Sequence, residues 1–333
     1  GLKFQNNVLV GDTIYGDNEW VIVEDIEEHT TSNIVTLENG IIIKTKDELI
    51  ETNIKGSYVL PSINSDVNIG FGFNNFSGDN NLIFEKHIKN EHGNRSNRLK
   101  ETINFPQMLD KDFSYFLGYF YGDGCVEYRR KDGKYQSVSL SCSDDYPEIK
   151  EKLASILTSI SPTVTTKRGD GALEVVMLSS IEFLENLNLN GILKQKAGSL
   201  IYPEKIMYSN IEQQLSYFCG FFDADGCAQK SKKSFKITII DESLIKMFQL
   251  LLLLNGILST TGKDNNYNSP SHWSQKYRLN VTGKYSIETL KKICTNSLKI
   301  NSSEISTTRD SNLTIYNIKD FGLKNNSDPS CGT

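Results

Sequence analysis

A nine-residue pattern rich in glycine and aromatic residues occurs twice in the chain. Residues 116–124 read FLGYFYGDG and residues 218–226 read FCGFFDADG, so the two copies start 102 residues apart. The similarity extends over about residues 113–200 and 215–303. Each copy shows helix and strand patterns in the order α-β-β-α-β-β-α. We therefore predict two copies of one α+β unit, packed about a pseudo-twofold axis as in a homodimer.

The elements of the repeat can be assigned from the sequence. Each nine-residue pattern lies in a helical run, which is expected to begin near Asp112 in the first copy and near Gln214 in the second. The strands that follow are expected at 136–141, 173–178, 235–240 and 277–282, and the helices at 144–160, 181–187, 241–257 and 287–293.

Small residues recur four positions apart in both patterns and so share one helix face, where two backbones can touch. The final Gly of each pattern is expected to end its helix in the αL conformation. Asp123 and Asp225 would then lie side by side at the end of a two-helix seam. The small residues are Gly118 and Gly122 in the first copy, and Gly220 and Ala224 in the second.

Two neighbouring carboxylates repel each other unless a cation neutralises them. Oxygen ligands of this kind suit Mg²⁺ or another hard divalent cation. For one copy alone, a buried Gly-rich helix with an Asp near its C-cap is the simpler interpretation, but the second copy argues against it. We predict a metal site formed by Asp123 and Asp225, with Gly122 and Ala224 as further ligands.

The two patterns resemble the LAGLIDADG signature of homing endonucleases. The second pattern is close to that signature, whereas the first has Tyr121 and Gly122 where the signature has Asp and Ala. The acid before the final Gly maps to Asp123 and Asp225, and Asp223 maps to a less constrained acidic position. The resemblance covers about residues 105–305 and includes the order of the repeat.

The resemblance implies a single-chain, pseudo-symmetric endonuclease that cuts both strands of DNA at a specific site. Each half would lay a saddle-shaped antiparallel sheet along the major groove. The two Asp residues would hold divalent cations over the minor groove, where one phosphodiester per strand is hydrolysed. The expected partner is double-stranded DNA with a long asymmetric target, and we expect a monomer.

Members of that family also use a Lys near each metal site. Lys196 lies 73 residues after Asp123, and Lys299 lies 74 residues after Asp225, so these two are the expected catalytic lysines. Lys194 competes with Lys196 for the first site. A solvated surface Lys is the alternative interpretation for each.

Positive charge gathers just after each pattern, where the DNA-facing strands should begin. The net charge of the chain is −5, but residues 1–60 hold four Lys and eleven Asp or Glu, so the rest of the chain is slightly basic. Taken alone, such clusters are usually solvated surface; after these patterns we expect them to bind DNA. They comprise Arg129, Arg130, Lys131 and Lys134, then Lys230, Lys232, Lys233 and Lys236.

The acidic first sixty residues have the pattern of a small all-β unit. Strands are expected at 8–10, 20–23, 33–37 and 41–44, and an Asn-, Gly- and Ser-rich stretch at about 64–97 reads as a linker. The unit resembles the first half of an intein splicing (Hint) domain, whose second half would return at about 305–326. An unrelated β domain that contacts DNA is the alternative.

The splicing junctions depart from the intein pattern at three positions. Val8 stands where an intein has a Cys or Ser nucleophile, Glu48 is nearest to an expected His, and Asn325 replaces the penultimate His. Asn326 could still cyclise, and Ser327 could still act as the acceptor. We therefore expect a degenerate or engineered splicing element.

Four segments follow from these assignments: 1–95 for the first splicing-like part and linker, 96–205 and 206–304 for the endonuclease halves, and 305–333 for the second splicing-like part. On this interpretation residues 1–7 and 327–333 are flanks from a host protein. No apolar run approaches the ~20 residues of a membrane span, no secretory leader is recognisable, and the six Cys form no CxxC pair. We expect an intracellular protein, cytoplasmic or nuclear, without a membrane partner.

Two other functions compete with an endonuclease embedded in a splicing-defective intein. A maturase-like module would keep the fold and bind DNA or RNA without cutting. A splicing-active intein would need a nucleophile at the N-terminal junction. Retention of both Asp123 and Asp225 favours cutting.

Overall fold

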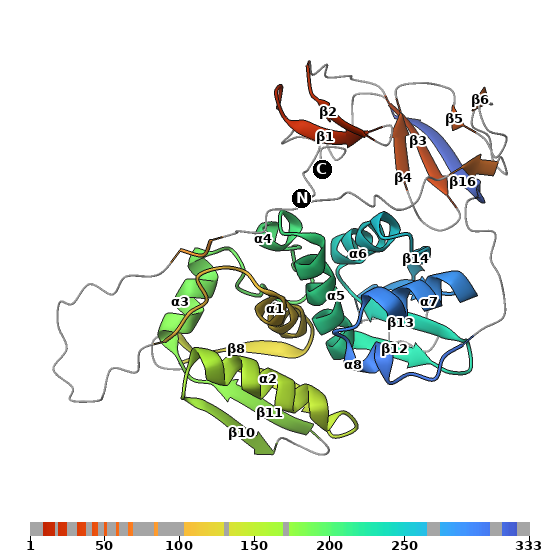
Figure 1. Cartoon of the computed structure of the whole chain (residues 1–333). Coiled ribbons are helices and arrows are strands. Elements are labelled where there is room, and N and C mark those ends of the chain that lie inside the picture. Colours follow the sequence, from red (N-terminus) through yellow and green to blue (C-terminus); the bar gives the residue numbers. More distant parts are fainter. Residues whose placement is uncertain are drawn as a thin grey trace.

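The structure is a computed structural model of the 333-residue chain. In Figure 1, helices α1 and α5 lie next to each other at the centre, and each has a sheet of its own half beside it. The residues that the structure describes are 9–16, 19–24, 32–37, 42–45, 50–51, 58–59, 66–68, 83–85, 103–129, 133–168, 173–264, 274–306 and 315–324.

The predicted order α-β-β-α-β-β-α is confirmed in both halves. The first half contains α1 (Lys111–Asp123), β8 (Gly124–Tyr128), β9 (Tyr135–Ser143), α2 (Pro147–Ile160), β10 (Val164–Arg168), β11 (Leu173–Leu178) and α3 (Ile181–Leu189). The second contains α5 (Ile211–Asp225), β12 (Gly226–Gln229), β13 (Ser234–Ile239), α6 (Glu242–Leu254), β14 (Ser259–Lys263), β15 (Tyr277–Val281) and α7 (Lys284–Ile293). Two short helices, α4 (Glu204–Met207) and α8 (Leu298–Asn301), complete the unit.

The two sheets have the same topology. Their strand orders are β8-β9-β11-β10 and β12-β13-β15-β14, and all neighbouring strands are antiparallel. Equivalent strands thus occupy equivalent places, as expected for two copies of one unit.

Helix α1 begins one residue earlier, and helix α5 three residues earlier, than the hydrophobic pattern predicts. The Asp110 side chain caps α1 by accepting a hydrogen bond of 2.7 Å from the main-chain N–H of Phe113. Asn210 caps α5 in a capping box with Gln213. Because polar caps lie outside the apolar run, they extend each helix beyond it.

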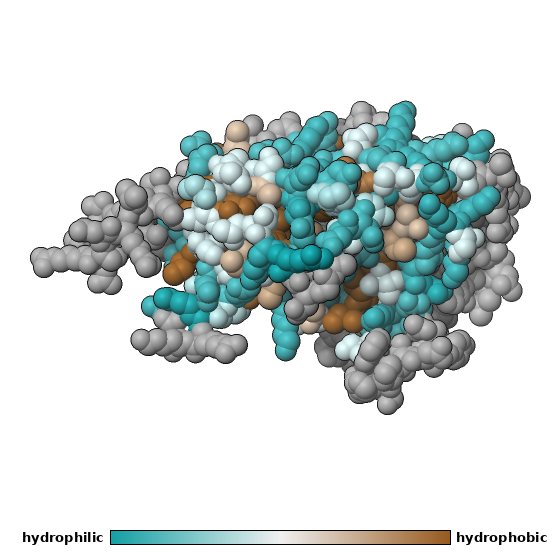
Figure 2. All heavy atoms as spheres, turned by 90° about the horizontal axis from the view of Figure 1, so that it is seen from below, coloured by the Kyte–Doolittle hydropathy of each residue, from teal (hydrophilic) through white to brown (hydrophobic). Residues whose placement is uncertain are grey.

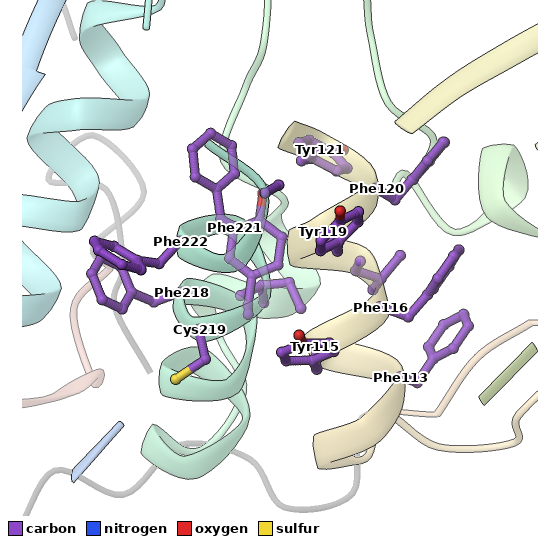
Figure 3. Close-up of a cluster of buried hydrophobic side chains, with 14 of the residues drawn as sticks. Phe113, Tyr115, Phe116, Tyr119, Phe120, Tyr121, Phe218, Cys219, Phe221 and Phe222 are labelled. Atoms are coloured by element: carbon purple, nitrogen blue, oxygen red, sulfur yellow. The ribbon is translucent and has the colours of Figure 1, made fainter. Parts of the chain in front are cut away.

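Aromatic side chains anchor each central helix in the core of its own half. Phe113, Phe116 and Phe120 point from α1 away from α5, whereas Phe218 and Phe222 point from α5 away from α1 (Figure 3). All five are buried. The side of each helix opposite to these rings is therefore left for the partner helix.

The contact between α1 and α5 requires glycine, which confirms the predicted small-residue face. A Cβ at Gly118 would lie 1.9 Å from the main-chain oxygen of Tyr217. A Cβ at Gly220 would lie equally close, 1.9 Å, to the main-chain oxygen of Tyr115. The two backbones therefore touch at pseudo-symmetric positions.

The prediction that the final Gly of each pattern adopts the αL conformation is wrong. Gly124 has φ −87° and Gly226 has φ −80°, both in extended backbone that starts the next strand. A Cβ at Gly124 would lie 2.4 Å from the Phe120 ring and from its carbonyl oxygen. Glycine is needed here because the chain turns tightly against the helix, and not because of a positive φ.

The flanking segments form small antiparallel sheets. β3 (Ser32–Leu37) lies between β4 (Ile42–Thr45) and the C-terminal strand β16 (Ile315–Lys324), and β16 also pairs with β7 (Asp66–Asn68). Two hairpins pair β1 (Thr13–Gly16) with β2 (Glu19–Ile22) and β5 (Ile50–Glu51) with β6 (Tyr58–Val59). The N-terminal and C-terminal segments thus share one sheet.

Two expectations for the N-terminal third need correction. Leu9 and Val10 are not in a strand, because the Asp12 side chain accepts a hydrogen bond of 2.6 Å from the Leu9 N–H and closes a turn. In the expected linker, Phe84 is buried against Phe105 and Phe113, with ring centroids 5.6 Å from each.

Among the described residues, no helix is long and apolar enough to cross a membrane.

Candidate active site

The ends of α1 and α5 bring the two motif acids to one place. Asp123 is the last residue of α1 and Asp225 is the last residue of α5. A Cβ at Gly122 would lie 2.4 Å from the Ala224 Cβ and 3.2 Å from the Asp225 Oδ2 atom. The last turns of the two helices therefore touch, with the Asp225 carboxyl across from Gly122.

The two carboxyl groups share an electrostatically unfavourable environment. Both side chains are exposed, but the protein around each carboxyl removes enough water to raise its pKa. For Asp225, this desolvation and then repulsion by Asp123 raise the pKa to about 6. The ammonium groups of Lys194 and Lys299 act in the opposite direction at both acids.

One lysine from each half closes the site in a pseudo-symmetric way. The Lys194 Nζ donates to the carbonyl oxygens of Gly122 at 2.5 Å and Gly124 at 2.7 Å. The Lys299 Nζ donates to those of Ala224 at 2.9 Å and Gly226 at 3.4 Å. Each ammonium thus lies against the carbonyls on both sides of a motif Asp.

For the first half, the structure places Lys194 at the site and not Lys196. Lys196 is exposed in the loop after α3. Lys194 and Lys299 are half-buried, and desolvation lowers the pKa of both ammonium groups, while the nearby Asp123 and Asp225 carboxylates oppose that shift. The equal spacing that favours Lys196 in the sequence is therefore misleading, and Lys299 lies where it is expected.

The donor set at the helix ends fits a hard divalent cation. Two carboxylates with raised pKa values stand beside the main-chain oxygens of Gly122 and Ala224, which accept from Lys194 and Lys299, and oxygen atoms of both kinds suit such a cation. In the part of the chain that the structure describes, no three His, Cys, Asp or Glu side chains are placed to hold a metal ion. A cation here would take its other ligands from main-chain oxygens, water or phosphate.

The basic cluster of the second half forms an exposed turn. Lys230, Lys232 and Lys233 lie between β12 and β13, and the Lys230 Nζ is 3.5 Å from a carboxylate oxygen of Glu304. Lys236, on β13, is half-buried and pairs with Asp264 at 3.1 Å. Three of the four lysines thus lie exposed on one turn, and two of the four, Lys230 and Lys236, pair with a carboxylate.

The basic cluster of the first half is described only at its ends. Arg129 and Lys134 are exposed and flank a turn, in which the Arg129 N–H donates to the Lys134 carbonyl at 2.8 Å. Arg130 and Lys131 lie outside the described residues, as do Val8, Glu48, Asn325, Asn326 and Ser327 of the expected splicing junctions.

Sequence reasoning missed a row of polar side chains on the second sheet. Core-facing Phe235, Ile237, Leu279 and Val281 alternate with less buried residues along β13 and β15. The strand register places the less buried residues side by side on the opposite face: Thr260 with Asn280 and Lys236, and Thr238 with Arg278. The alternation of apolar and polar residues in each strand could have predicted this polar row. From below, hydrophilic side chains cover much of the surface around smaller hydrophobic patches (Figure 2).

Part of the chain matches a known family model, and several known proteins are similar to it. Residues 212–295 match the family model of the LAGLIDADG-like domain. Two curated proteins of Methanocaldococcus jannaschii are similar: glutamine–fructose-6-phosphate aminotransferase (isomerizing), 26% identical over 192 residues, and probable translation initiation factor IF-2, 24% identical over 223 residues. These matches cover 57% and 65% of this chain but only 17% and 18% of the relatives.

Solved structures of the homing endonuclease I-DmoI are also similar. Its complex with DNA and Mn has a TM-score of 0.42 and 19% identity, and the match covers 58% of this chain and 98% of that chain. Further I-DmoI structures with Mg or Ca are among the matches. The family match falls on the second half of the repeat, so residues 212–295, which include most of α5 and Asp225, are similar to a LAGLIDADG-like domain.

Proposed function

We propose that the chain is a site-specific DNA endonuclease that hydrolyses one phosphodiester in each strand with the help of divalent cations. The observation that carries the proposal is the pseudo-symmetric pair of sites at the ends of α1 and α5. Each contains one carboxylate and one ammonium group, and the stronger attractions run between the halves, from Lys299 to Asp123 and from Lys194 to Asp225. A duplex has two backbones related by a twofold axis, so two such sites suit double-strand cleavage.

The side chains have distinct roles in this proposal. Asp123 and Asp225, with the carbonyls of Gly122 and Ala224, would hold the cations, whose chemistry is to activate water and offset phosphate charge. The ammonium groups of Lys194 and Lys299 lie close enough to both acids to balance their charge. When DNA enters, the same ammonium groups can stabilise negative charge that develops on the phosphate oxygens.

Incubation with a divalent cation and a library of DNA fragments tests this proposal. The expected result is double-strand breaks at one long asymmetric sequence. The proposal also includes that the protein acts as a monomer, within the cell, on genomic DNA. Binding without any break, with Mg²⁺ or Mn²⁺, would instead assign the chain to the maturase-like class of nucleic-acid binders.

Alanine at Lys230, Lys232 and Lys233 is expected to weaken DNA binding. Each phosphate contact that is lost should reduce the slope of log affinity against log salt concentration by about 0.9, because fewer counterions are released. Titration of labelled DNA at several salt concentrations measures the slope. A matched control replaces Lys246, Lys284 and Lys292, which are exposed on α6 and α7. A slope that falls equally in both triple variants would contradict a DNA-binding role for the turn.

We further propose that the flanking strands are a splicing-like unit, interrupted by the endonuclease. The supporting observation is that β16, from the C-terminal segment, pairs with β3 and β7 from the N-terminal segment. On this proposal residues 1–95 and 305–333 form one unit, and 96–304 form the inserted endonuclease.

The junction residues are expected to prevent ligation of the flanks. Val8 has no nucleophile to attack the preceding carbonyl, whereas the Asn326 side-chain amide can slowly cleave before Ser327. Val8→Cys alone should restore little; Val8→Cys with His at positions 48 and 325 should restore a thiol-sensitive N-terminal thioester. Mass spectrometry of the expressed chain with and without thiol measures this. A ligated product of residues 1–7 and 327–333 from the unchanged sequence would contradict the assignment of the junctions.

A further inference from the structure

A buried carboxylate in the second half accepts four hydrogen bonds. The Asp223 side chain is 1% exposed and lies on α5, two residues before Asp225. Its Oδ1 accepts from the Ser297 hydroxyl at 2.6 Å and the Lys299 N–H at 3.0 Å. Its Oδ2 accepts from the Tyr115 hydroxyl at 2.7 Å and the Leu298 N–H at 2.8 Å. Both carboxylate oxygens are thus fully used inside the protein.

Three of these four donors belong to the start of α8, the helix that carries Lys299. Asp223 therefore ties the main chain of Lys299 to α5, the helix that also carries Asp225. The same tie leaves the Lys299 ammonium group against the carbonyls on both sides of Asp225. Because the Lys299 main chain is bound to Asp223 and its ammonium group to two carbonyls, the side chain has few alternative positions, and the geometry of this site is set before DNA binds.

The first half of the protein supports this arrangement. The Lys152 ammonium group on α2 lies 3.5 Å from the centre of the Tyr115 ring and donates to the carbonyl of Asn296 at 2.8 Å. Asn296 in turn donates to the Ser216 hydroxyl on α5. The segment before α8 is therefore fixed from α2, α1 and α5 together.

The pseudo-symmetric positions in the first half do not repeat this network. The repeat spacing of 102 residues relates Tyr115 to Tyr217 and Tyr121 to Asp223. Tyr121 carries a phenol in place of the carboxylate of Asp223. The buried hydroxyl of Tyr217 has no hydrogen-bond partner within the described part of the chain. Its ring packs instead against those of Tyr121 and Tyr202, with centroids 5.8 and 5.3 Å away.

The lysine of the first half is consequently held more loosely through its main chain. The Tyr121 hydroxyl donates to the carbonyl of Leu193, the residue before Lys194, at 3.4 Å. The Tyr121 hydroxyl also forms a hydrogen bond with the Gln195 side chain. Both are bonds between neutral groups, whereas Asp223 makes four bonds of 2.6 to 3.0 Å as a charged acceptor. Charge-assisted bonds of that length are markedly stronger.

We infer that Asp223 is a positioning residue for Lys299, that the first half has no equivalent, and that the two strands are therefore cut in a fixed order. The strand at the site that contains Lys299 is cut first, because that site needs less reorganisation. The order of cutting rests on the proposed nuclease function, whereas the positioning of Lys299 does not.

Hydrogen exchange in the protein without metal or DNA tests the positioning directly. Asp223→Asn replaces one acceptor oxygen by an NH₂ group that faces donors, so amide exchange in residues 297–301 should accelerate about tenfold, while residues 193–195 stay unchanged. Tyr115→Phe removes only the hydroxyl that donates to the Asp223 Oδ2, should accelerate the same segment more weakly, and covers the case in which Asp223→Asn does not fold. Tyr121→Phe is the matched control and should leave residues 297–301 unchanged. Unchanged exchange at Leu298 and Lys299 in both Asp223→Asn and Tyr115→Phe would overturn the inference.

Strand-specific nicking of end-labelled target DNA tests the order of cutting. The unchanged protein should accumulate DNA nicked in one strand, and Asp223→Asn should slow that strand about tenfold while the other stays within about twofold. Equal rates for both strands in the unchanged protein, or equal slowing of both by Asp223→Asn, would overturn the fixed order, because a purely structural role affects both sites alike. Absence of all cleavage would instead refute the proposed function, and the exchange data would then decide the positioning alone.

Discussion

Asp123→Asn and Asp225→Asn are each expected to abolish double-strand cleavage while DNA affinity stays within about tenfold (~1.4 kcal/mol). Asparagine keeps the shape of the side chain but removes the negative charge that attracts a divalent cation, so the site loses its main ligand. Phosphate contacts elsewhere on the surface supply most of the binding energy, so affinity should persist. Cleavage of end-labelled target DNA and a binding titration at one salt concentration measure the two effects.

Asp112→Asn is the matched control, since Asp112 is exposed in the first turn of α1, at the opposite end of the helix from Asp123. It should cleave normally. The pH dependence of the thermal unfolding midpoint provides a second check, on Asp225→Asn. Because the pKa of Asp225 rises from 3.8 to about 6 in the folded protein, folding stability falls as the pH rises through that interval, and Asp225→Asn removes this loss. A variant that still cuts both strands would refute the assignment of the acids.

The architecture of residues 103–306 could be predicted because the chain contains two copies of the same unit, which can be compared with each other. One Gly-rich helix with a terminal Asp is ambiguous, but a second copy with the same downstream order fixes which residues are equivalent. Periodicity then separates the buried face of each strand from the exposed face, as with Phe235 and Ile237 on β13. The fold follows from these two signals together.

The lysine of the first site could not be predicted because the two halves differ where that lysine is attached. Lys299 lies on α8, and the segment that carries Lys194 contains no corresponding helix. Without that turn of helix the chain reaches the site three residues sooner, and nearly equal spacing selects Lys196 instead. Equal spacing in two repeats identifies equivalent residues only where the connecting segments have the same conformation.

The hydrogen-bond network around Asp223 could not be predicted from the sequence either. Asp223 maps to a position that tolerates variation, and nothing in the sequence joins it to Ser297 or Tyr115, which lie 74 and 108 residues away. Only the packing of α8 against α5 shows that this acid is internally bonded while Asp225, two residues later, is exposed. Adjacent acids in one motif therefore perform different tasks, which depend on which side of the helix they occupy.

Gly118→Ala and Gly220→Ala are expected to destabilise the protein by about 3 kcal/mol each. The added Cβ would lie 1.9 Å from a main-chain oxygen of the partner helix, and a helix backbone cannot move aside as a flexible side chain can. The helices must separate, so each variant should also lose cleavage as Asp123 and Asp225 move apart. Thermal unfolding should show a fall in midpoint of roughly 10 °C.

Gly262→Ala is the matched control for these two variants. Gly262 lies in β14, and a Cβ there meets nothing within 4 Å. The change removes backbone freedom from the unfolded chain without a clash, so its effect on the free energy of unfolding should stay within about 0.5 kcal/mol. If Gly118→Ala and Gly220→Ala unfold at the same temperature as Gly262→Ala, the two helices cannot be in backbone contact in solution. The site that depends on that contact would then need a different explanation, because only touching helices bring Asp123 and Asp225 to one place.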